Sequence, residues 1–372
     1  MKNNVLLISP EPWSGHWVSK HHYAKSLVDA GASVYFLEPP SLTEKRFNVC
    51  QAEGMDGIYV LSCKRVFPAL QYMPAFIRCW IERGWLSFLE NFLNVHFDTI
   101  WLFENSRFFD MRFAGDRLKI YHQVDLNQDF HPLKAVKTAD VALCTSNAIA
   151  NILAQSGKQV YKVNHGVAIT NCDAEHLPES PKINDSDINA VYVGNLDIAY
   201  LDLSLLQEVI ATHPNVVFHL VGNYSLSGST YTMLRKYLNV RWWGRVSSSG
   251  VASILQKMDI CLLVYKSEEY RDQLSNPHKL MEYLASGAVC VATYTDEYKD
   301  YPCLLQMAER REDYLPLFNE VVKNLDQHNS PGSKALRKCF AESNSYPKQL
   351  QRIEDILVAS GCSRTIMRGK DD

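Results

Sequence analysis

The sequence predicts an α/β protein made of two doubly wound domains. Its 372 residues are 47% hydrophobic and 21% charged, which is enough chain and enough apolar side chain for two cores. Apolar runs of strand length alternate with helix-like stretches along most of the chain, as they do when helices cover both faces of a parallel sheet. A polar, proline-containing stretch at 178–189 interrupts this alternation. We therefore expect domains at 1–177 and 190–345, followed by a last segment at 346–372.

The strands expected in the first domain are short, continuously apolar runs, as the strands of a buried parallel sheet are. They lie at 5–9, 34–38, 58–62, 99–103, 119–124, 141–145 and 160–163. Helices are expected between several of them, for example at 18–30 and 146–155.

The second domain shows the same alternation. Its strands are expected at 190–194, 216–221, 240–243, 260–265 and 288–292. Between the last two strands, residues 276–287 predict a short helix with Asn276 as N-cap, Pro277 in the first helical position and Gly287 at the exit. Both domains are thus expected to be Rossmann-like.

Composition excludes several classes of protein. The formal net charge of −3 leaves no basic excess with which a domain could bind nucleic acid. The ten cysteines include no C-x-x-C pair, and Cys144, Cys261 and Cys290 lie within apolar strands, which favours free thiols over disulfides or zinc. The N-terminal apolar run is too short for a signal peptide, and no run reaches about 18 apolar residues. We expect a cytoplasmic protein, with a place at the inner face of a membrane left open.

Common catalytic motifs are absent from the sequence. No two of the 17 glycines are two residues apart, so there is no G-x-G-x-x-G fingerprint, and there is no Walker A, G-x-S-x-G or H-E-x-x-H motif. These absences argue against NAD enzymes, P-loop NTPases, serine hydrolases and zincins. A ligand cleft at the carboxyl ends of parallel strands remains the expected site.

Residues 276–287 carry the most informative pattern. A helix that starts at a strand edge presents free N–H groups and the positive end of its dipole to an anion. Lys279 lies in its first turn and Glu282 three residues later on the same face. A cation for phosphates and a carboxylate for ribose hydroxyls suit a nucleotide sugar. From spacing alone, a solvated surface pair of Lys279 and Glu282 is the favoured alternative.

The run resembles the P-x-K-x-x-E-Y-L-A-x-G segment of bacterial GT-B glycosyltransferases that use nucleotide sugars. This resemblance implies that Lys279 contacts phosphate and Glu282 contacts ribose. Segments 194–206, 239–246 and 340–346 also resemble parts of that family's donor domain. The resemblance implies two Rossmann-like domains facing across a cleft, with a C-terminal helix in 346–372 that crosses back to the first. The most similar types are the inverting, membrane-associated glucuronosyltransferases of exopolysaccharide assembly and teichuronic-acid-type transferases.

The sequence departs from the family pattern in two places. Many relatives carry Glu eight residues before the ribose Glu, where this chain has Leu274. Many also carry Arg and Lys in the turn after the first donor-domain strand, which here reads Asn195-Leu196-Asp197. Half of the usual diphosphate clamp is therefore missing. Cations elsewhere are expected to compensate: Lys266, Arg271 or Arg245.

Asp125 is the expected general base of an inverting transfer. It follows the strand at 119–124, at the edge that would face the cleft, and the resembling inverting enzymes have an Asp base at the end of the matching strand. Two alternatives stay open: Asp125 caps the following helix or turn, or Asp129 is the base.

Other candidate site residues come from loops at strand ends. Gly15 and His16 lie in the loop after the first strand, which the resemblance places near acceptor and donor phosphates, and Glu104 is a weaker candidate. Asn164–Val167 resembles the family's P-N-G-V turn at the end of the first domain, where Gly166 would supply the unusual backbone angles of a hinge. The remaining donor-binding candidates are Asn276, His278, Tyr265, Lys266, Asn195 and Arg245. Ordinary packing or strand-end roles are open for each of them.

No cofactor and no essential metal ion are expected. Asp185-Ser186-Asp187 is the one D-x-D pattern outside the C-terminal tail, and it falls in the predicted linker. Residues 64–97 interleave aromatic and basic side chains, which suits either a peripheral membrane contact or core helices whose arginine stems reach outward.

The predicted function is that of a glycosyltransferase acting on a nucleotide-diphosphate sugar, with UDP as the favoured nucleotide. Its expected acceptor is a polysaccharide or lipid-linked glycan of envelope or exopolysaccharide synthesis, with no nucleic-acid partner. A nucleotide-sugar epimerase of the same fold and a non-catalytic scaffold of a polysaccharide assembly complex are the alternatives.

Overall fold

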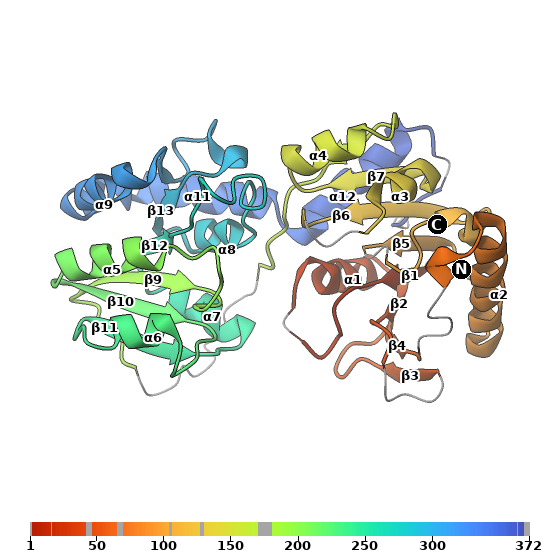
Figure 1. Cartoon of the computed structure of the whole chain (residues 1–372), viewed down its shortest axis with the longest axis horizontal. Helices are drawn as coiled ribbons and strands as arrows, with labels where there is room; N and C mark the ends of the chain where they lie inside the picture. The colour runs from red at the N-terminus through yellow and green to blue at the C-terminus, as the bar shows by residue number, and fades with distance from the viewer. Residues whose placement is uncertain are drawn as a thin grey trace. The chain divides into compact units, whose positions relative to one another are not determined.

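The computed structural model describes residues 2–15, 17–41, 47–64, 70–103, 106–126, 130–169, 181–362 and 364–367. The chain forms two compact units (Figure 1). Unit 1 comprises Met1–His165 and Tyr346–Asp372, and unit 2 comprises Gly166–Ser345. The last helix therefore belongs to the same unit as the N-terminal strands. The described part of the predicted linker, 181–189, belongs to unit 2.

Unit 1 is built on an eight-stranded sheet in the order β3-β4-β2-β1-β5-β6-β7-β8. Its strands are β1 (Asn4–Ile8), β2 (Ser33–Leu37), β3 (Asn48–Gln51), β4 (Ile58–Ser62), β5 (Thr99–Leu102), β6 (Leu118–Gln123), β7 (Val141–Cys144) and β8 (Tyr161–Lys162). Only β3 runs antiparallel to its neighbour among the described strands. The sequence did not predict β3, because this edge strand is mostly exposed and has no apolar run.

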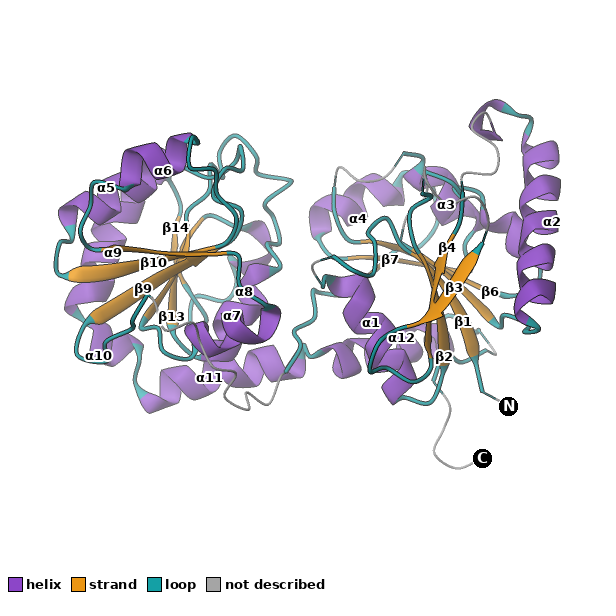
Figure 2. Cartoon of the chain, turned by 90° about the horizontal axis from the view of Figure 1, so that it is seen from below, coloured by secondary structure: helices purple, strands orange, loops and turns teal. Residues whose placement is uncertain are grey.

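Helices cover both faces of this sheet, as a doubly wound fold requires (Figure 2). Leucines and aromatic residues of α1 (Ser19–Asp29) and α12 (Tyr346–Ala359) pack in one core cluster. On the other face, α2 (Ala75–Leu93), α3 (Pro132–Thr138) and α4 (Asn147–Ala154) contribute to a second cluster. Short 3-10 helices lie at η1 (Leu70–Tyr72) and η2 (Met111–Ala114).

Unit 2 has a six-stranded parallel sheet in the order β11-β10-β9-β12-β13-β14. Its strands are β9 (Ile188–Val193), β10 (Val216–Val221), β11 (Val240–Gly244), β12 (Ile260–Leu263), β13 (Val289–Thr293) and β14 (Gln306–Ala308). Counted from β9, this is the 3-2-1-4-5-6 order of a dinucleotide-type Rossmann sheet. The order reverses between β9 and β12, and ligands bind beyond the carboxyl ends of the strands at such a switch point.

The helices of unit 2 connect these strands. They are α5 (Leu203–Thr212), α6 (Ser229–Leu234), α7 (Ser248–Leu255), α8 (Lys279–Ser286), α9 (Tyr314–Lys323), α10 (Leu325–His328) and α11 (Pro331–Ser343), with 3-10 helices η3 (Asp296–Tyr298) and η4 (Arg311–Asp313). The predicted α/β class with two Rossmann-like halves is confirmed in both units. Within the described residues, no helix is both long enough and apolar enough to span a bilayer.

Candidate functional site

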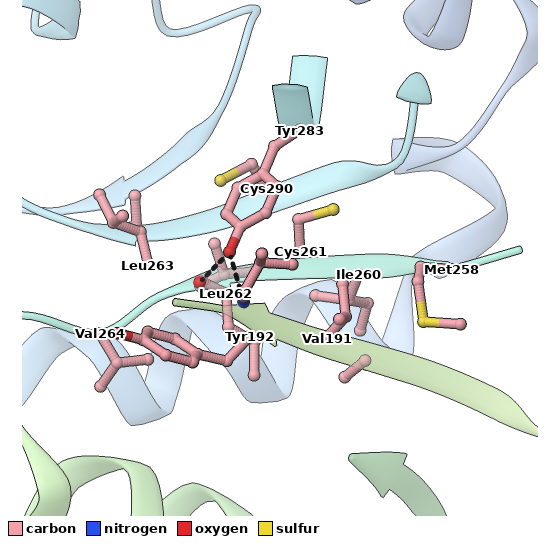
Figure 3. Close-up of a cluster of buried hydrophobic side chains, with 14 of the residues drawn as sticks. Val191, Tyr192, Met258, Ile260, Cys261, Leu262, Leu263, Val264, Tyr283 and Cys290 are labelled. Atoms are coloured by element: carbon pink, nitrogen blue, oxygen red, sulfur yellow. Dashed lines mark hydrogen bonds between the residues drawn. The ribbon is translucent and has the colours of Figure 1, made fainter. Parts of the chain in front are cut away.

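Tyr283 fixes α8 over the switch point of the unit 2 sheet. The strands β9 and β12 pair only at Ala190–Ile260 and Val191–Cys261, and then separate. The Tyr283 hydroxyl fills the gap: it accepts a hydrogen bond from the Val193 N–H at 2.9 Å and donates one to the Leu262 carbonyl at 3.2 Å (Figure 3). Burial raises the pKa of Tyr283, so the hydroxyl stays protonated.

The helix α8 starts later than predicted. His278 is its N-cap and Lys279 its first residue, so the predicted N-cap Asn276 and first helical residue Pro277 precede the helix. The reason is a tight first turn, in which the N–H of Leu280 bonds to the carbonyl of Pro277, three residues back. The predicted exit is confirmed, since Gly287 is the C-cap with φ 85°.

Lys279 projects its ammonium group to the carboxyl end of β9. A Cβ atom added to Gly194, the residue after β9, would lie 2.6 Å from Lys279 Nζ and 3.1 Å from its Cε. The side chain is partly buried, and it forms no hydrogen bond or ion pair with any residue that the structure describes. Burial lowers the pKa of Lys279, while Tyr200 and Glu282 raise it. A bound anion would favour the charged form, and no described carboxylate forms an ion pair with this ammonium.

Two glycines make room for this arrangement. Gly194 has φ +155°, and Gly222, the residue after β10, has φ +137°. A residue with a side chain would be strained at these backbone angles, whereas glycine adopts them readily. A Cβ on Gly222 would lie 1.8 Å from the Gly194 carbonyl oxygen. The backbone after β9 and the backbone after β10 therefore approach each other so closely that only glycine fits. Main-chain atoms, with no side chain between them, lie next to the Lys279 ammonium.

Glu282 lies one turn beyond Lys279 on α8, as the sequence predicted. Its side chain is exposed, although the dense surroundings raise the pKa of its carboxyl and Lys279 lowers it. Because its carboxyl reaches solvent, Glu282 is available as a hydrogen-bond acceptor. The alternative that Lys279 and Glu282 are a solvated surface pair fits the exposed Glu282. It does not fit Lys279, which is half-buried.

Tyr265 turns inward instead of lining the site. Its side chain is 4% exposed, burial raises its pKa to about 12, and its hydroxyl shares a hydrogen bond with that of Tyr192. The ring of Tyr200 packs edge-on against it, with centroids 5.0 Å apart. Tyr265 therefore packs behind the residues that surround Lys279. Its buried hydroxyl is not accessible to a diphosphate, so the predicted contact between the two is not supported.

The remaining donor-site candidates lie at the same edge of the sheet. Asn195 is exposed and its side-chain oxygen accepts the Asp197 N–H at 3.1 Å, which closes the turn after β9. Neither Lys266 nor Arg245 forms an ion pair with a described residue. By contrast, Arg271 is held 3.5 Å from Asp296 and over the ring of Tyr294 at 4.5 Å. Lys266 and Arg245 are thus better placed than Arg271 to replace the missing basic turn.

Asp125 lies at the carboxyl end of β6 in unit 1, where it meets a buried lysine. Lys20 of α1 is 1% exposed, and its ammonium lies 3.2 Å from Glu11 Oε1 and 4.0 Å from Asp125 Oδ2. Half of the Asp125 side chain is exposed. It is not the N-cap of α3, the next described helix, because that residue is His131. Lys20 thus lies between two carboxyl groups, of which Asp125 is the more exposed.

Several predicted residues bear less weight. Gly15 lies in an exposed turn, its N–H bonded to the Pro12 carbonyl at 3.4 Å. His16, Glu104 and Asp129 lie outside the described residues. Within the described parts of the chain, no three His, Cys, Asp or Glu side chains form a group that could hold a metal ion.

Sequence reasoning missed the residues that support the candidates: Tyr192, Tyr200, Gly222 and Tyr283 in unit 2, and Glu11, Lys20 and His122 in unit 1. His122 is fully buried against Tyr23, Trp101 and Phe103, with neither ring nitrogen hydrogen-bonded, and burial lowers its pKa to about 3. Only two of them lie just after an expected strand: Gly222 directly follows 216–221, and Glu11 lies two residues after 5–9.

One family of known proteins matches the part of unit 2 that contains α8. Residues 188–302, which include β9, β12 and α8, match the family described as group 1 glycosyl transferases. A comparison with curated protein sequences finds no match.

Solved structures share the fold at low sequence identity. Sucrose-phosphate synthase from Thermosynechococcus elongatus is 12% identical, with a TM-score of 0.68 over 96% of this chain and 100% of that one. A trehalose-6-phosphate protein from E. coli bound with UDP-2-fluoro glucose is 12% identical, with a TM-score of 0.66 over 95% and 99%. WaaG, a glycosyltransferase involved in lipopolysaccharide biosynthesis, is 12% identical, with a TM-score of 0.62 over 95% and 99%. The chain thus has the GT-B fold of glycosyltransferases, and its segment 188–302 is similar to the group 1 family.

Proposed function

We propose that the protein is a metal-independent glycosyltransferase that moves a sugar, with inversion, from a UDP-sugar to a polysaccharide or lipid-linked glycan. The observation that carries this proposal is the partly buried ammonium of Lys279, which has no partner among the described residues and lies beside Gly194 at the switch point of unit 2. A diphosphate is the anion that such an edge suits, because the positive end of the α8 dipole and a cation lie together there.

The neighbours support the finer parts of the proposal. The E. coli neighbour binds a UDP-sugar analogue, which favours uracil as the base, and WaaG acts in lipopolysaccharide biosynthesis, which favours an envelope glycan as the acceptor. The sequence resemblance favours the glucuronosyltransferase type of exopolysaccharide assembly. A cytoplasmic location, at or near the inner face of the membrane, belongs to the same proposal.

Each residue has a defined part in the proposed reaction. The acceptor oxygen attacks the anomeric carbon, the bond from that carbon to the diphosphate oxygen breaks, and the diphosphate leaves with the bonding electrons. Lys279 stabilises the charge that builds on the leaving diphosphate. Glu282 accepts hydrogen bonds from the ribose hydroxyls. Asp125 accepts the proton of the acceptor hydroxyl, and the buried Lys20 holds this carboxylate in place.

Product analysis tests the proposal. The purified protein is incubated with each of a panel of nucleotide sugars, with and without a lipid-linked glycan fraction, and released nucleoside diphosphate and sugar products are measured. We expect nucleoside diphosphate release that depends on acceptor. Asp125→Asn should lower kcat by about 10²- to 10⁴-fold, the range for removal of a general base, while leaving donor binding intact. Lys279→Ala should lower kcat by about 10²-fold or more.

A matched control and two contrary outcomes make this test decisive. Lys257 is an exposed lysine of unit 2 that precedes β12, at the opposite edge of the sheet from Lys279. Lys257→Ala should leave turnover unchanged. Conversion of a donor sugar in the absence of acceptor would replace the proposal with an epimerase, and no turnover with any donor would replace it with a scaffold.

A further inference from the structure

The helix α2 presents a row of exposed aromatic side chains on the outer side of unit 1. Phe76, Trp80, Phe88 and Phe92 are 76%, 75%, 55% and 54% exposed. They recur at multiples of four residues, so they follow a ridge that turns about 40° around the helix axis for every four residues and rises about 24 Å from first to last. Tyr72 and Met73, which precede the helix, extend this row and are also exposed. Figures 1 and 2 both show α2 at the rim of unit 1.

The opposite face of α2 is the one that packs into the protein. Its buried residues are Arg78, Glu82, Leu86 and Leu89, and the two leucines belong to a core cluster under the sheet. The aromatic row is therefore not the core-facing side of the helix. Because α2 is already anchored by its buried face, the row is held in place without a partner.

The one exposed charge on α2 itself is positive. Neither carboxylate of α2 reaches the exposed face, because Glu82 is 1% exposed and Glu90 is held at 2.6 Å by Arg117. The one charged residue exposed on α2 is Arg83, which also donates to the Arg112 carbonyl at 3.1 Å. No exposed acidic residue on α2 would repel an anionic surface.

A buried cluster on the core-facing side of α2 carries further positive charge. Asp110 is fully buried, with Arg112 at 2.6 Å, Arg78 at 2.9 Å and Lys134 at 3.9 Å. Burial raises the pKa of the neighbouring Glu82 to about 8, so this carboxyl is mostly protonated at neutral pH. Three cations therefore surround one ionised carboxylate, and two of them, Arg112 and Lys134, are partly exposed.

We propose that this α2 face, defined as Phe76, Trp80, Arg83, Phe88 and Phe92, binds the surface of an anionic lipid bilayer. Aromatic side chains on one face of a surface helix insert at the headgroup level, and adjacent cations are attracted to anionic lipids. Phe47 packs on Phe88 and Phe92, which leaves Phe76 and Trp80 as the residues that enter most deeply. The helix lies on the bilayer and does not cross it. This inference does not depend on the proposed function.

Vesicle flotation with the full chain tests the inference, without donor or acceptor. The vesicles are phosphatidylcholine alone and phosphatidylcholine mixed with phosphatidylglycerol. We expect the wild type to float with the mixed vesicles and to bind pure phosphatidylcholine at least tenfold more weakly. The double substitution Phe76→Ser, Trp80→Ser should weaken binding to mixed vesicles more than tenfold. The matched control, Leu226→Ser with Leu238→Ser, changes two residues of unit 2 that are 70% and 93% exposed, and it should bind as the wild type does.

A charge substitution gives a second, independent readout. Arg83→Gln should weaken binding to the mixed vesicles about fivefold, the factor for one basic residue at an anionic surface, and leave binding to phosphatidylcholine unchanged.

Lipids with brominated acyl chains should quench the tryptophan emission of the wild type more than that of Trp80→Phe. This readout keeps the inference testable if the double substitution disturbs folding.

Three outcomes would overturn the inference. The first is a wild type that does not float with either vesicle. The second is a Phe76→Ser, Trp80→Ser variant that folds and floats as well as the wild type. The third is self-association of the wild type, seen by sedimentation and lost in the double variant, with no vesicle binding, which would make the α2 face a contact between two copies of the chain.

Discussion

Replacing Tyr283 with phenylalanine removes one oxygen atom from the place where β9 and β12 separate. The change leaves no large cavity, because the ring stays. It does leave the Val193 N–H without its acceptor and the Leu262 carbonyl without this donor, both in the buried core of unit 2. A buried N–H left unpaired costs about 1–3 kcal/mol, and a lost hydrogen bond to a carbonyl adds about 1 kcal/mol. Tyr283→Phe should therefore destabilise unit 2 by about 2–4 kcal/mol.

Tyr298 offers a matched control in the same unit. Its side chain is 2% exposed, and its hydroxyl has no hydrogen-bond partner in the described structure. Tyr298→Phe removes a buried polar atom that gains nothing from folding, so it should be neutral or stabilise unit 2 by about 1 kcal/mol. The two substitutions make the same chemical change at two buried tyrosines, with opposite expected signs.

Amide hydrogen exchange resolves the effect without assuming that the two units unfold together. Peptides from β9 and β12 should exchange faster in Tyr283→Phe than in the wild type, whereas peptides from unit 1 should be unchanged. A thermal shift should accompany this, at about 2–4 °C per kcal/mol for a unit of this size. Equal protection in Tyr283→Phe and Tyr298→Phe would refute the assignment of Tyr283 as the anchor of α8.

Three further predictions concern packing and pH. Gly222→Ala should prevent unit 2 from folding, since its Cβ would lie 1.8 Å from the Gly194 carbonyl oxygen; a normal thermal transition for this variant would contradict the close approach. Burial raises the pKa of Glu82 from 4.5 to about 8, so native unit 1 holds a proton that the unfolded chain releases, and its stability should fall as the pH rises through this window. Urea unfolding of Glu82→Gln should lack this decline, and an unchanged pH profile would count against it. Burial lowers the pKa of His219 from 6.5 to about 4, and its Nδ1 accepts a hydrogen bond from Trp243, so unit 2 should lose stability as the pH falls from 6.5 toward 4. Urea unfolding of His219→Gln should show a smaller loss over the same range, and an equal loss would place the acid sensitivity elsewhere.

The sequence predicted most strands because buried parallel strands are continuous apolar runs. It missed β3, whose four residues are largely exposed and whose pairing with β4 is antiparallel. The sequence predicted that α8 starts at Asn276, because capping residues and proline are typical of helix starts. In the structure, a tight turn from Pro277 to Leu280 comes first, and the helix begins at Lys279. Local signals locate a helix, and tertiary contacts fix its first residue.

The candidate site was predictable only where a residue follows a strand or matches a known pattern. Lys279, Glu282 and Asp125 met that condition. Lys20 did not, because nothing in the sequence shows that a helical lysine is buried beside Glu11 and Asp125. Buried polar partners depend on contacts between distant segments, which a single sequence does not display. Tyr265 shows the converse, a strand-end residue that looked functional and turns into the core.

The binding of nucleotides to the full-length protein tests the central claim most directly. Titration calorimetry with a panel of nucleoside diphosphates should show binding of UDP to the wild type, unchanged in Lys257→Ala. Lys279→Ala should weaken it at least tenfold, since a charge-assisted contact contributes about 1.5–3 kcal/mol. Failure of the wild type to bind any nucleoside diphosphate, or equal affinity in Lys279→Ala, would contradict the assignment of this sheet edge as a diphosphate site.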